Sequence, residues 1–93
     1  MNKAQMHADI CVELNKTYQA KNADYGDSFA KVRKEYPDAI CVRLIDKLER
    51  LKTLYRGGSQ QVKDESVEDT LKDLANYCIM ELVEIKSDNP YKL

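Results

Sequence analysis

Carboxylate and amide side chains recur along one side of the segment from residue 65 to residue 86. They are spaced three or four residues apart, so in a helix they share one face: Glu65, Asp69, Asp73 and Asn76. Carboxylates one helical turn apart can share a Mg²⁺ ion, which keeps several waters and bridges to substrate phosphates. Such an ion can activate water against a phosphoryl group. The candidate catalytic residues on this interpretation are Asp69 and Asp73.

Two more acids precede this segment, and they extend the possible metal site. The full candidate set of metal ligands is Asp46, Glu49, Asp69 and Asp73. If the protein is a hydrolase, these residues would hold Mg²⁺, and otherwise no cofactor is expected. The alternative is a solvated polar helix face. Asp73 and Asn76 favour a contact, because both lie in mid-helix, where neither residue type has good propensity.

Three basic residues lie at positions i, i+4 and i+7 of another helical segment, namely Arg43, Lys47 and Arg50. They share one edge of a helix, where they could converge on a polyphosphate, because Arg clamps phosphate with two parallel bonds and Lys adds a point charge. The alternative is a solvated edge with weak surface ion pairs. Tyr25 lies beside Gly26, just before a predicted helix N-terminus, where it could stack on a base or simply form part of a turn. The predicted ligand-binding residues are Tyr25, Arg43, Lys47, Arg50 and Asn76.

Hydrophobic periodicity predicts an all-α protein that forms a single domain over residues 1–93. The expected bundle has three main helices and one short helix, over residues 3–21, 28–35, 38–55 and 65–86. Gly26 permits a turn between the first two helices, and Asp27 or Ser28 can cap the second. Gly57 and Gly58 end the third helix.

The last helix carries one apolar stripe that we expect to pack against the rest of the chain. Its members recur at spacings of three and four: Val67, Leu71, Leu74, Cys78, Leu82 and Ile85. Towards the end of the helix Ile79, Met80 and Val83 leave almost no polar side. A helix that is apolar all round is usually buried on several sides, so we expect a homo-oligomer that covers Ile79, Met80, Leu82 and Val83.

The composition of the chain limits the classes of partner that we expect the protein to bind. The 93 residues have a net charge of −1, so no overall field attracts DNA or an anionic membrane, and direct DNA binding is not expected. No apolar run or signal-peptide pattern predicts a membrane span or export, so we expect a cytoplasmic protein. Three cysteines without paired spacing predict buried, reduced thiols rather than disulfides or a zinc site. The single histidine, His7, is expected at the surface.

Three blocks of sequence resemble a known family. KNADYGDSF, RLIDKLERL and ESVEDTLKDLANY, in this order, are similar to the nucleotide-modification-associated domain family, first type, of small phage and bacterial helical proteins. The blocks cover about a third of the chain. The resemblance implies a nucleotide or a nucleotide derivative as ligand. It also implies the cytoplasm of a bacterial host cell if the protein is phage-encoded.

More distantly, the layout resembles MazG-like all-α nucleoside triphosphate pyrophosphatases. Those enzymes place E-x-x-E and E-x-x-D on successive helices around magnesium and work as dimers or tetramers. Asp46 and Glu49 would be the first pair here. Asp69 and Asp73 would be the second, one residue further apart than that pattern asks.

Three functions therefore remain open. The favoured one is a small nucleotide-binding protein that holds, and can sequester, a phosphate-bearing nucleotide without turnover. The first alternative is a Mg²⁺-dependent pyrophosphatase, and the second is a non-catalytic protein-interaction module.

Overall fold

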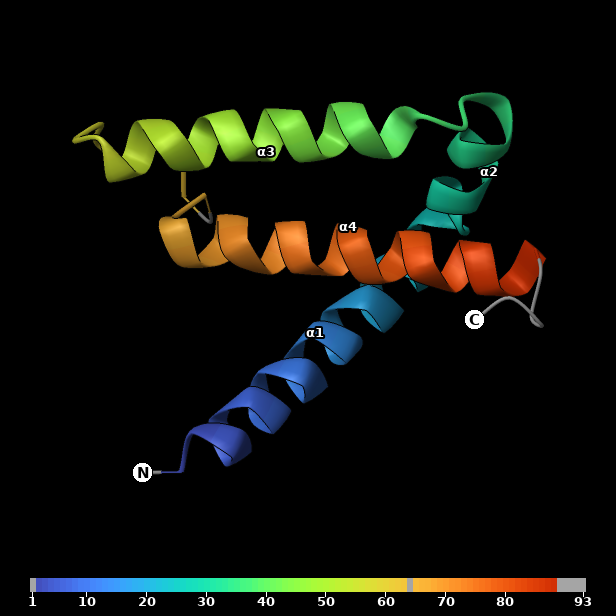
Figure 1. The fold of residues 1–93 in the computed structure, drawn as a ribbon, viewed down its shortest axis with the longest axis horizontal. Helices are drawn as coiled ribbons and strands as arrows, with labels where there is room; N and C mark the ends of the chain where they lie inside the picture. Colours follow the sequence, from blue (N-terminus) through green and yellow to red (C-terminus); the bar gives the residue numbers. More distant parts are fainter. Residues whose placement is uncertain (1, 64, 89–93) are drawn as a thin grey trace.

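The computed structural model describes residues 2–63 and 65–88, and α-helices make up most of them (Figure 1). The helices are α1 (Lys3–Tyr25), α2 (Ser28–Glu35), α3 (Ala39–Tyr55) and α4 (Val67–Asp88). The described ranges contain no β-strand. The prediction of an all-α bundle with three main helices and one short helix is confirmed.

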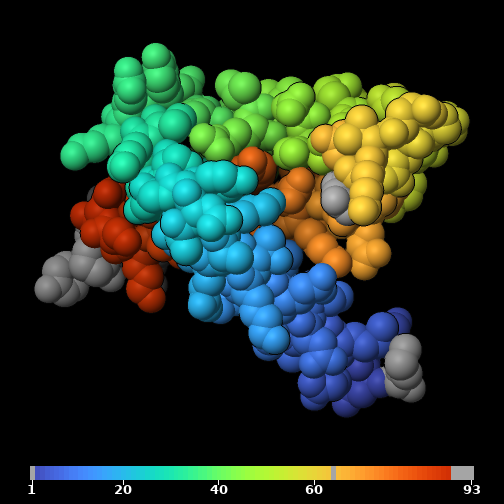
Figure 2. Space-filling view, turned by 180° about the vertical axis from the view of Figure 1, so that it is seen from behind, coloured from blue at the N-terminus to red at the C-terminus, as the bar shows by residue number. Residues whose placement is uncertain are grey.

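An antiparallel hairpin of α3 and α4 forms the centre of the fold (Figure 1). The two helices lie side by side and are joined by the connection around Gly57 and Gly58. Figure 2, seen from behind, shows the end of α1 and α2 lying across one face of this hairpin. In Figure 1 the opposite face of the hairpin is turned to the viewer, and no helix crosses it.

The first helix is longer than predicted. It continues past residue 21 to Tyr25, because the sequence offers no helix breaker before Gly26. Gly26 adopts the left-handed conformation with φ 60°, and its N–H bonds to the carbonyl of Asn22. Asp27 follows with φ 58°, an uncommon conformation for a residue with a Cβ. These two residues turn the chain sharply into α2.

The second helix has the predicted bounds, Ser28–Glu35, and the third and fourth differ from prediction by one or two residues. The third helix starts at Ala39 rather than residue 38. The fourth starts at Val67 and continues to Asp88, whereas the prediction was residues 65–86. Its start is set by Ser66, whose Oγ accepts a hydrogen bond from the amide of Asp69 at 3.1 Å.

Few side chains of the single chain are buried. Of residues 2–63 and 65–88, the buried apolar ones are Leu14 and Phe29, and the buried polar one is Thr70, which has no exposed surface. The prediction that the apolar stripe of the last helix packs against its own chain is wrong, because four of its members are exposed: Leu71, Cys78, Leu82 and Ile85. The predicted burial of the cysteines is also wrong, since Cys11, Cys41 and Cys78 are all exposed and free.

The side of α4 that faces α3 is instead held by a polar contact around Thr70. The Thr70 hydroxyl donates to the carbonyl of Ser66 at 2.8 Å and accepts from Arg50 Nε at 3.1 Å. The arginine thereby links α3 to the first turn of α4. None of the helices formed by the described residues combines the length and the apolar composition that crossing a bilayer requires.

Replacing Thr70 by valine should destabilise the fold by about 1–3 kcal/mol, because Arg50 Nε would lose a partner in a buried place. For a domain of this size, each kcal/mol lowers the melting temperature by about 4–8 °C. Thr53→Val is the matched control, because the Thr53 hydroxyl also donates to the carbonyl four residues earlier but is exposed. Circular dichroism melting measures both variants. Equal melting temperatures would show that the interhelical bond contributes nothing.

Candidate functional site

A hollow of about 170 Å³ lies where all four helices meet. We call it the central pocket. Its lining comprises Tyr18 and Lys21 from α1, Ser28 and Phe29 from α2, Arg43 and Lys47 from α3, and Asp73, Asn76, Tyr77 and Met80 from α4. The pocket therefore exists only when the bundle is assembled.

Arg43 lines the central pocket beside a stacked pair of aromatic rings. Its guanidinium carbon lies 5.1 Å from the ring centre of Phe29 and 5.5 Å from that of Tyr77. The two rings stack, with their centres 6.3 Å apart. Cation–π attraction holds the guanidinium in place without neutralising it. Among the described residues no carboxylate forms an ion pair with Arg43.

Asp73 collects cations from two other helices. Lys47 Nζ lies 3.3 Å from its carboxylate, Arg50 Nη2 lies 3.5 Å away, and Lys21 Nζ lies 4.0 Å away. Lys47 and Asp73 are only 19% and 29% exposed, whereas Lys21 is 60% exposed. The aspartate therefore joins α1, α3 and α4 at one point.

Arg50 is engaged mainly in holding the fold together. Besides Thr70, it pairs with Glu65, its Nη1 lying 3.2 Å from that carboxylate. Its Nη2 is buried and has no hydrogen-bond partner, so the approach to Asp73 is an ion pair without hydrogen-bond geometry. Arg50 lies next to the central pocket but not in its lining.

The central pocket is positively charged, although the chain as a whole is not. Lys21, Arg43 and Lys47 contribute three positive charges to its lining and Asp73 contributes one negative charge, which gives a formal charge of 3 − 1 = +2. The net charge of the whole chain is −1. Basic residues gathered around a half-enclosed hollow attract anions far more strongly than the same residues spread over a surface.

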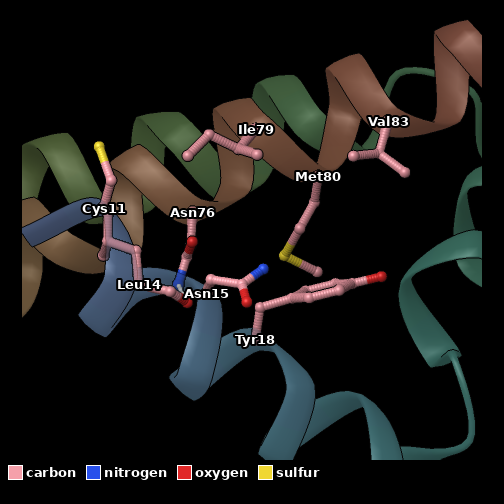
Figure 3. Close-up of a pocket in the computed structure, with 8 residues that line it drawn as sticks. All are labelled: Cys11, Leu14, Asn15, Tyr18, Asn76, Ile79, Met80 and Val83. Atoms are coloured by element: carbon pink, nitrogen blue, oxygen red, sulfur yellow. Dashed lines mark hydrogen bonds between the residues drawn. The ribbon is translucent and has the colours of Figure 1, made fainter. Parts of the chain in front are cut away.

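Asn76 stands between the central pocket and a second hollow of about 200 Å³ that runs between α1 and α4 (Figure 3). Its Nδ2 donates to the carbonyl of Leu14 at 3.1 Å, which fixes α1 against α4. Tyr18 and Met80 also line both hollows, and in Figure 3 their side chains extend towards each other. The remaining lining of the second hollow is largely apolar, with Cys11, Ile79 and Val83 among its members.

The predicted ligand-binding residues are partly brought together. Arg43, Lys47 and Asn76 line the central pocket, and Arg50 adjoins it. Tyr25 ends α1 with its side chain 66% exposed and lies in the lining of neither hollow.

The four candidate metal ligands do not gather. Within residues 2–63 and 65–88 there is no group of three or more acidic, histidine or cysteine side chains that could hold a metal ion. Asp46 and Glu49 are exposed on α3, and Glu49 pairs with Lys52 at 3.0 Å. Asp73 is occupied by cations, and Asp69 is occupied by Ser66.

Asp69 serves the start of α4. Its carboxylate accepts hydrogen bonds from the hydroxyl of Ser66 at 2.7 Å and from the backbone N–H of Ser66 at 3.2 Å. In return, the Ser66 hydroxyl accepts a hydrogen bond from the backbone N–H of Asp69, so the two residues form a reciprocal capping box. These hydrogen bonds, with the hydroxyl foremost, lower the pKa of Asp69 below its ordinary value.

Six residues of the central pocket are not among the predicted site residues: Tyr18, Lys21, Ser28, Phe29, Tyr77 and Met80. The sequence predicts that the first helix ends at Lys21, whereas it continues for another turn, to Tyr25. Tyr77 follows Asn76 directly, and Phe29 is the only phenylalanine of the chain. An aromatic residue next to a mid-helix Asn was therefore the one available signal.

The fold and the pocket together define a small all-α protein with a cationic, aromatic-lined pocket. The sequence model of the family described as "Nucleotide modification associated domain 1" matches residues 21–85, which include α2, α3 and most of α4. The chain belongs to this family. No curated protein and no solved structure matches it.

Replacing Ser66 by alanine should raise the pKa of Asp69 towards its ordinary value, because the hydroxyl that stabilises the carboxylate is lost. A lowered pKa in the folded state stabilises the fold above the unfolded pKa, and this stabilisation disappears as pH falls through the folded pKa. The variant should therefore lose less stability than the wild type on acidification below about pH 4. It should also lose about 1 kcal/mol of cap stabilisation at neutral pH.

NMR titration of the Asp69 carboxyl group, together with melting curves at several pH values, measures both effects. Ser59→Ala is the control, because the Ser59 hydroxyl contacts Gln61 in the exposed connection. If Asp69 titrates alike in the wild type and in Ser66→Ala, the capping box does not set its pKa.

Proposed function

We propose that this protein binds a phosphate-bearing nucleotide in the central pocket and holds it without chemical turnover. The observation that carries the proposal is the Arg43 guanidinium, which lines the pocket within cation–π distance of both aromatic rings and has no carboxylate partner among the described residues. A positioned and unneutralised guanidinium is the group that proteins favour for bidentate phosphate recognition.

The neighbouring lysines complete a phosphate-binding side of the pocket. Lys47 is held beside Arg43 on the same helix, one turn further on, and Lys21 approaches from α1. The first turn of α2 begins at Ser28, which also lines the pocket, and no side chain caps that helix. Its free amides and the positive end of its dipole therefore add to the attraction for an anion.

The second hollow suits the nucleoside part of such a ligand. It opens from the phosphate-binding side at Asn76 and offers the ring of Tyr18 and the thioether of Met80 as apolar surfaces. A nucleobase can stack on an aromatic ring irrespective of its identity. Because the amide nitrogen of Asn76 is used by Leu14, its oxygen is the atom left to accept a hydrogen bond from the ligand.

The interactions of Asp69 and Asp73 within the fold support nucleotide binding rather than nucleotide hydrolysis. The cap formed by Asp69 and the ion pairs of Asp73 stabilise the fold in the same conformation that forms the pocket. A ligand held in this way would be sequestered in the cytoplasm. The family to which the chain belongs supports a nucleotide as the ligand class through its description.

A thermal-shift screen of mono-, tri- and cyclic nucleotides, each with and without Mg²⁺, should give a dose-dependent rise in melting temperature for at least one of them. Chromatography should recover that nucleotide intact. Products that appear only with Mg²⁺ would favour the pyrophosphatase alternative, and no shift with any nucleotide would contradict the proposal.

Calorimetry on variants tests the pocket itself. Arg43→Gln and Lys47→Gln should each weaken binding by about 10- to 100-fold, because a hydrogen bond to a charged group contributes about 1.5–3 kcal/mol. Lys52→Gln is the matched control, because Lys52 lies on the same helix but pairs with Glu49 outside the pocket. Equal affinities for all three variants would place the nucleotide elsewhere.

A further inference from the structure

We infer that the uncovered face of the α3–α4 hairpin is the surface on which a second copy of this chain packs, so that two hairpins form a four-helix bundle. We call this surface the hairpin face. It is marked by large apolar side chains that are exposed in the single chain: Ile45, Leu48 and Tyr55 on α3, and Leu71, Leu82 and Ile85 on α4.

Helical register places these residues opposite the central pocket. Successive residues of an α-helix are about 100° apart around its axis, so residues two positions apart lie on nearly opposite sides of the helix. On α3, Ile45 and Leu48 each precede a pocket-side cation by two positions, namely Lys47 and Arg50. On α4, Leu71 precedes Asp73 in the same way.

The pocket side of both helices faces α1 and α2, as the lining of the central pocket requires. The hairpin face is therefore turned away from the rest of the chain. Figure 1 looks onto this side of α3 and α4, and Figure 2 shows α1 and α2 on the other.

The exposed area is larger than a monomer of this size should have. The chain exposes 7294 Å². A compact monomer of 10.7 kDa is expected to expose about 5,500 Å². The excess of about 1,800 Å² belongs to the whole chain, including the first half of α1, which projects from the hairpin (Figure 1). It is more than twice the roughly 800 Å² per partner that a standard stable interface buries, so the hairpin face can supply such an interface from part of it.

The shape and charge of the hairpin face favour a second copy over a different partner. Two antiparallel helices with one apolar side are half of a four-helix bundle, and a two-fold axis brings the same stripes together. Lys52 interrupts the α3 stripe, but its charge is balanced by Glu49 on the same helix. The six residues that mark the hairpin face are uncharged and Lys52 is paired, so these residues do not favour an acidic or a basic partner. Within residues 2–63 and 65–88 the single chain buries only Leu14 and Phe29 among its apolar side chains, so the hairpin needs a permanent partner, which another copy provides.

This surface differs from the one that the sequence predicts for an oligomer. Of the four residues behind that prediction, only Leu82 lies on the hairpin face, whereas Ile79, Met80 and Val83 line the second hollow. Packing through the hairpin face leaves both hollows open to a ligand.

The three native cysteines distinguish the two surfaces without any mutation. Cys41 and Cys78 lie on the hairpin face, two positions before Arg43 and Met80, whereas Cys11 lines the second hollow. All three are exposed and free in the single chain. In purified native protein we expect N-ethylmaleimide to modify Cys41 and Cys78 about tenfold or more slowly than Cys11, because those two react only when the copies separate.

Peptide mass spectrometry follows the three rates, and light scattering gives the mass, expected to be at least twice 10.7 kDa. Equal modification of all three cysteines, or a single-chain mass, would overturn the inference. Protection of Cys11 alone would move the interface to the second hollow.

Two adjacent positions on α4 provide a paired test. Leu82→Glu places a charge on the hairpin face and should reduce the mass to that of one chain, with all cysteines reactive. Val83→Glu places the same charge at the second hollow, about 100° around the helix, and should leave the mass unchanged. A dissociated Val83→Glu beside an intact Leu82→Glu oligomer would refute the proposed surface.

Discussion

The carboxylate of Asp73 is the point on which the arrangement of the helices depends. It receives Lys47 and Arg50 from α3 and lies within 4.0 Å of Lys21 on α1, so three helices are joined at one half-buried group. Removing Asp73 would leave Lys47 and Arg50 facing each other without their shared carboxylate, in a place that water reaches poorly. Arg50 extends the cluster to Thr70, which fixes the register of α4 against α3. The pocket forms beside this cluster and shares its cations.

The polar side of α4 faces the other helices and its apolar side faces outward, which is the reverse of the usual arrangement. In most soluble bundles the apolar stripe faces inward and the polar face meets water. Here Asp73 and Asn76 face the neighbouring helices, while Leu71 and Leu82 face outward. The periodicity of the sequence correctly predicts which residues share a side. It does not predict which side the chain covers, because that depends on partners from distant segments and, on our inference, from another copy.

The same limit explains which parts of the pocket could be foreseen. Arg43, Lys47 and Asn76 could be chosen from spacing and helix propensity, both of which are local properties. Lys21 and Phe29 could not, because they reach the pocket only through the crossing of α1 and the turn into α2. The existence and the type of each helix could also be predicted, because they depend on local sequence. The extra turn of α1 could not, because the polar residues before Gly26 resemble a loop although none of them breaks a helix.

The unequal exposure of the two lysines around Asp73 has a consequence for ionic strength. At physiological salt the Debye length is about 8 Å, so mobile ions screen groups that water surrounds but act weakly on groups enclosed by protein. Lys21 is mostly in water, and its attraction for Asp73 or for a bound anion weakens as salt is added. Lys47 is largely enclosed, and its attraction persists. Salt therefore loosens α1 at the rim of the pocket first and leaves the α3–α4 core of the site intact.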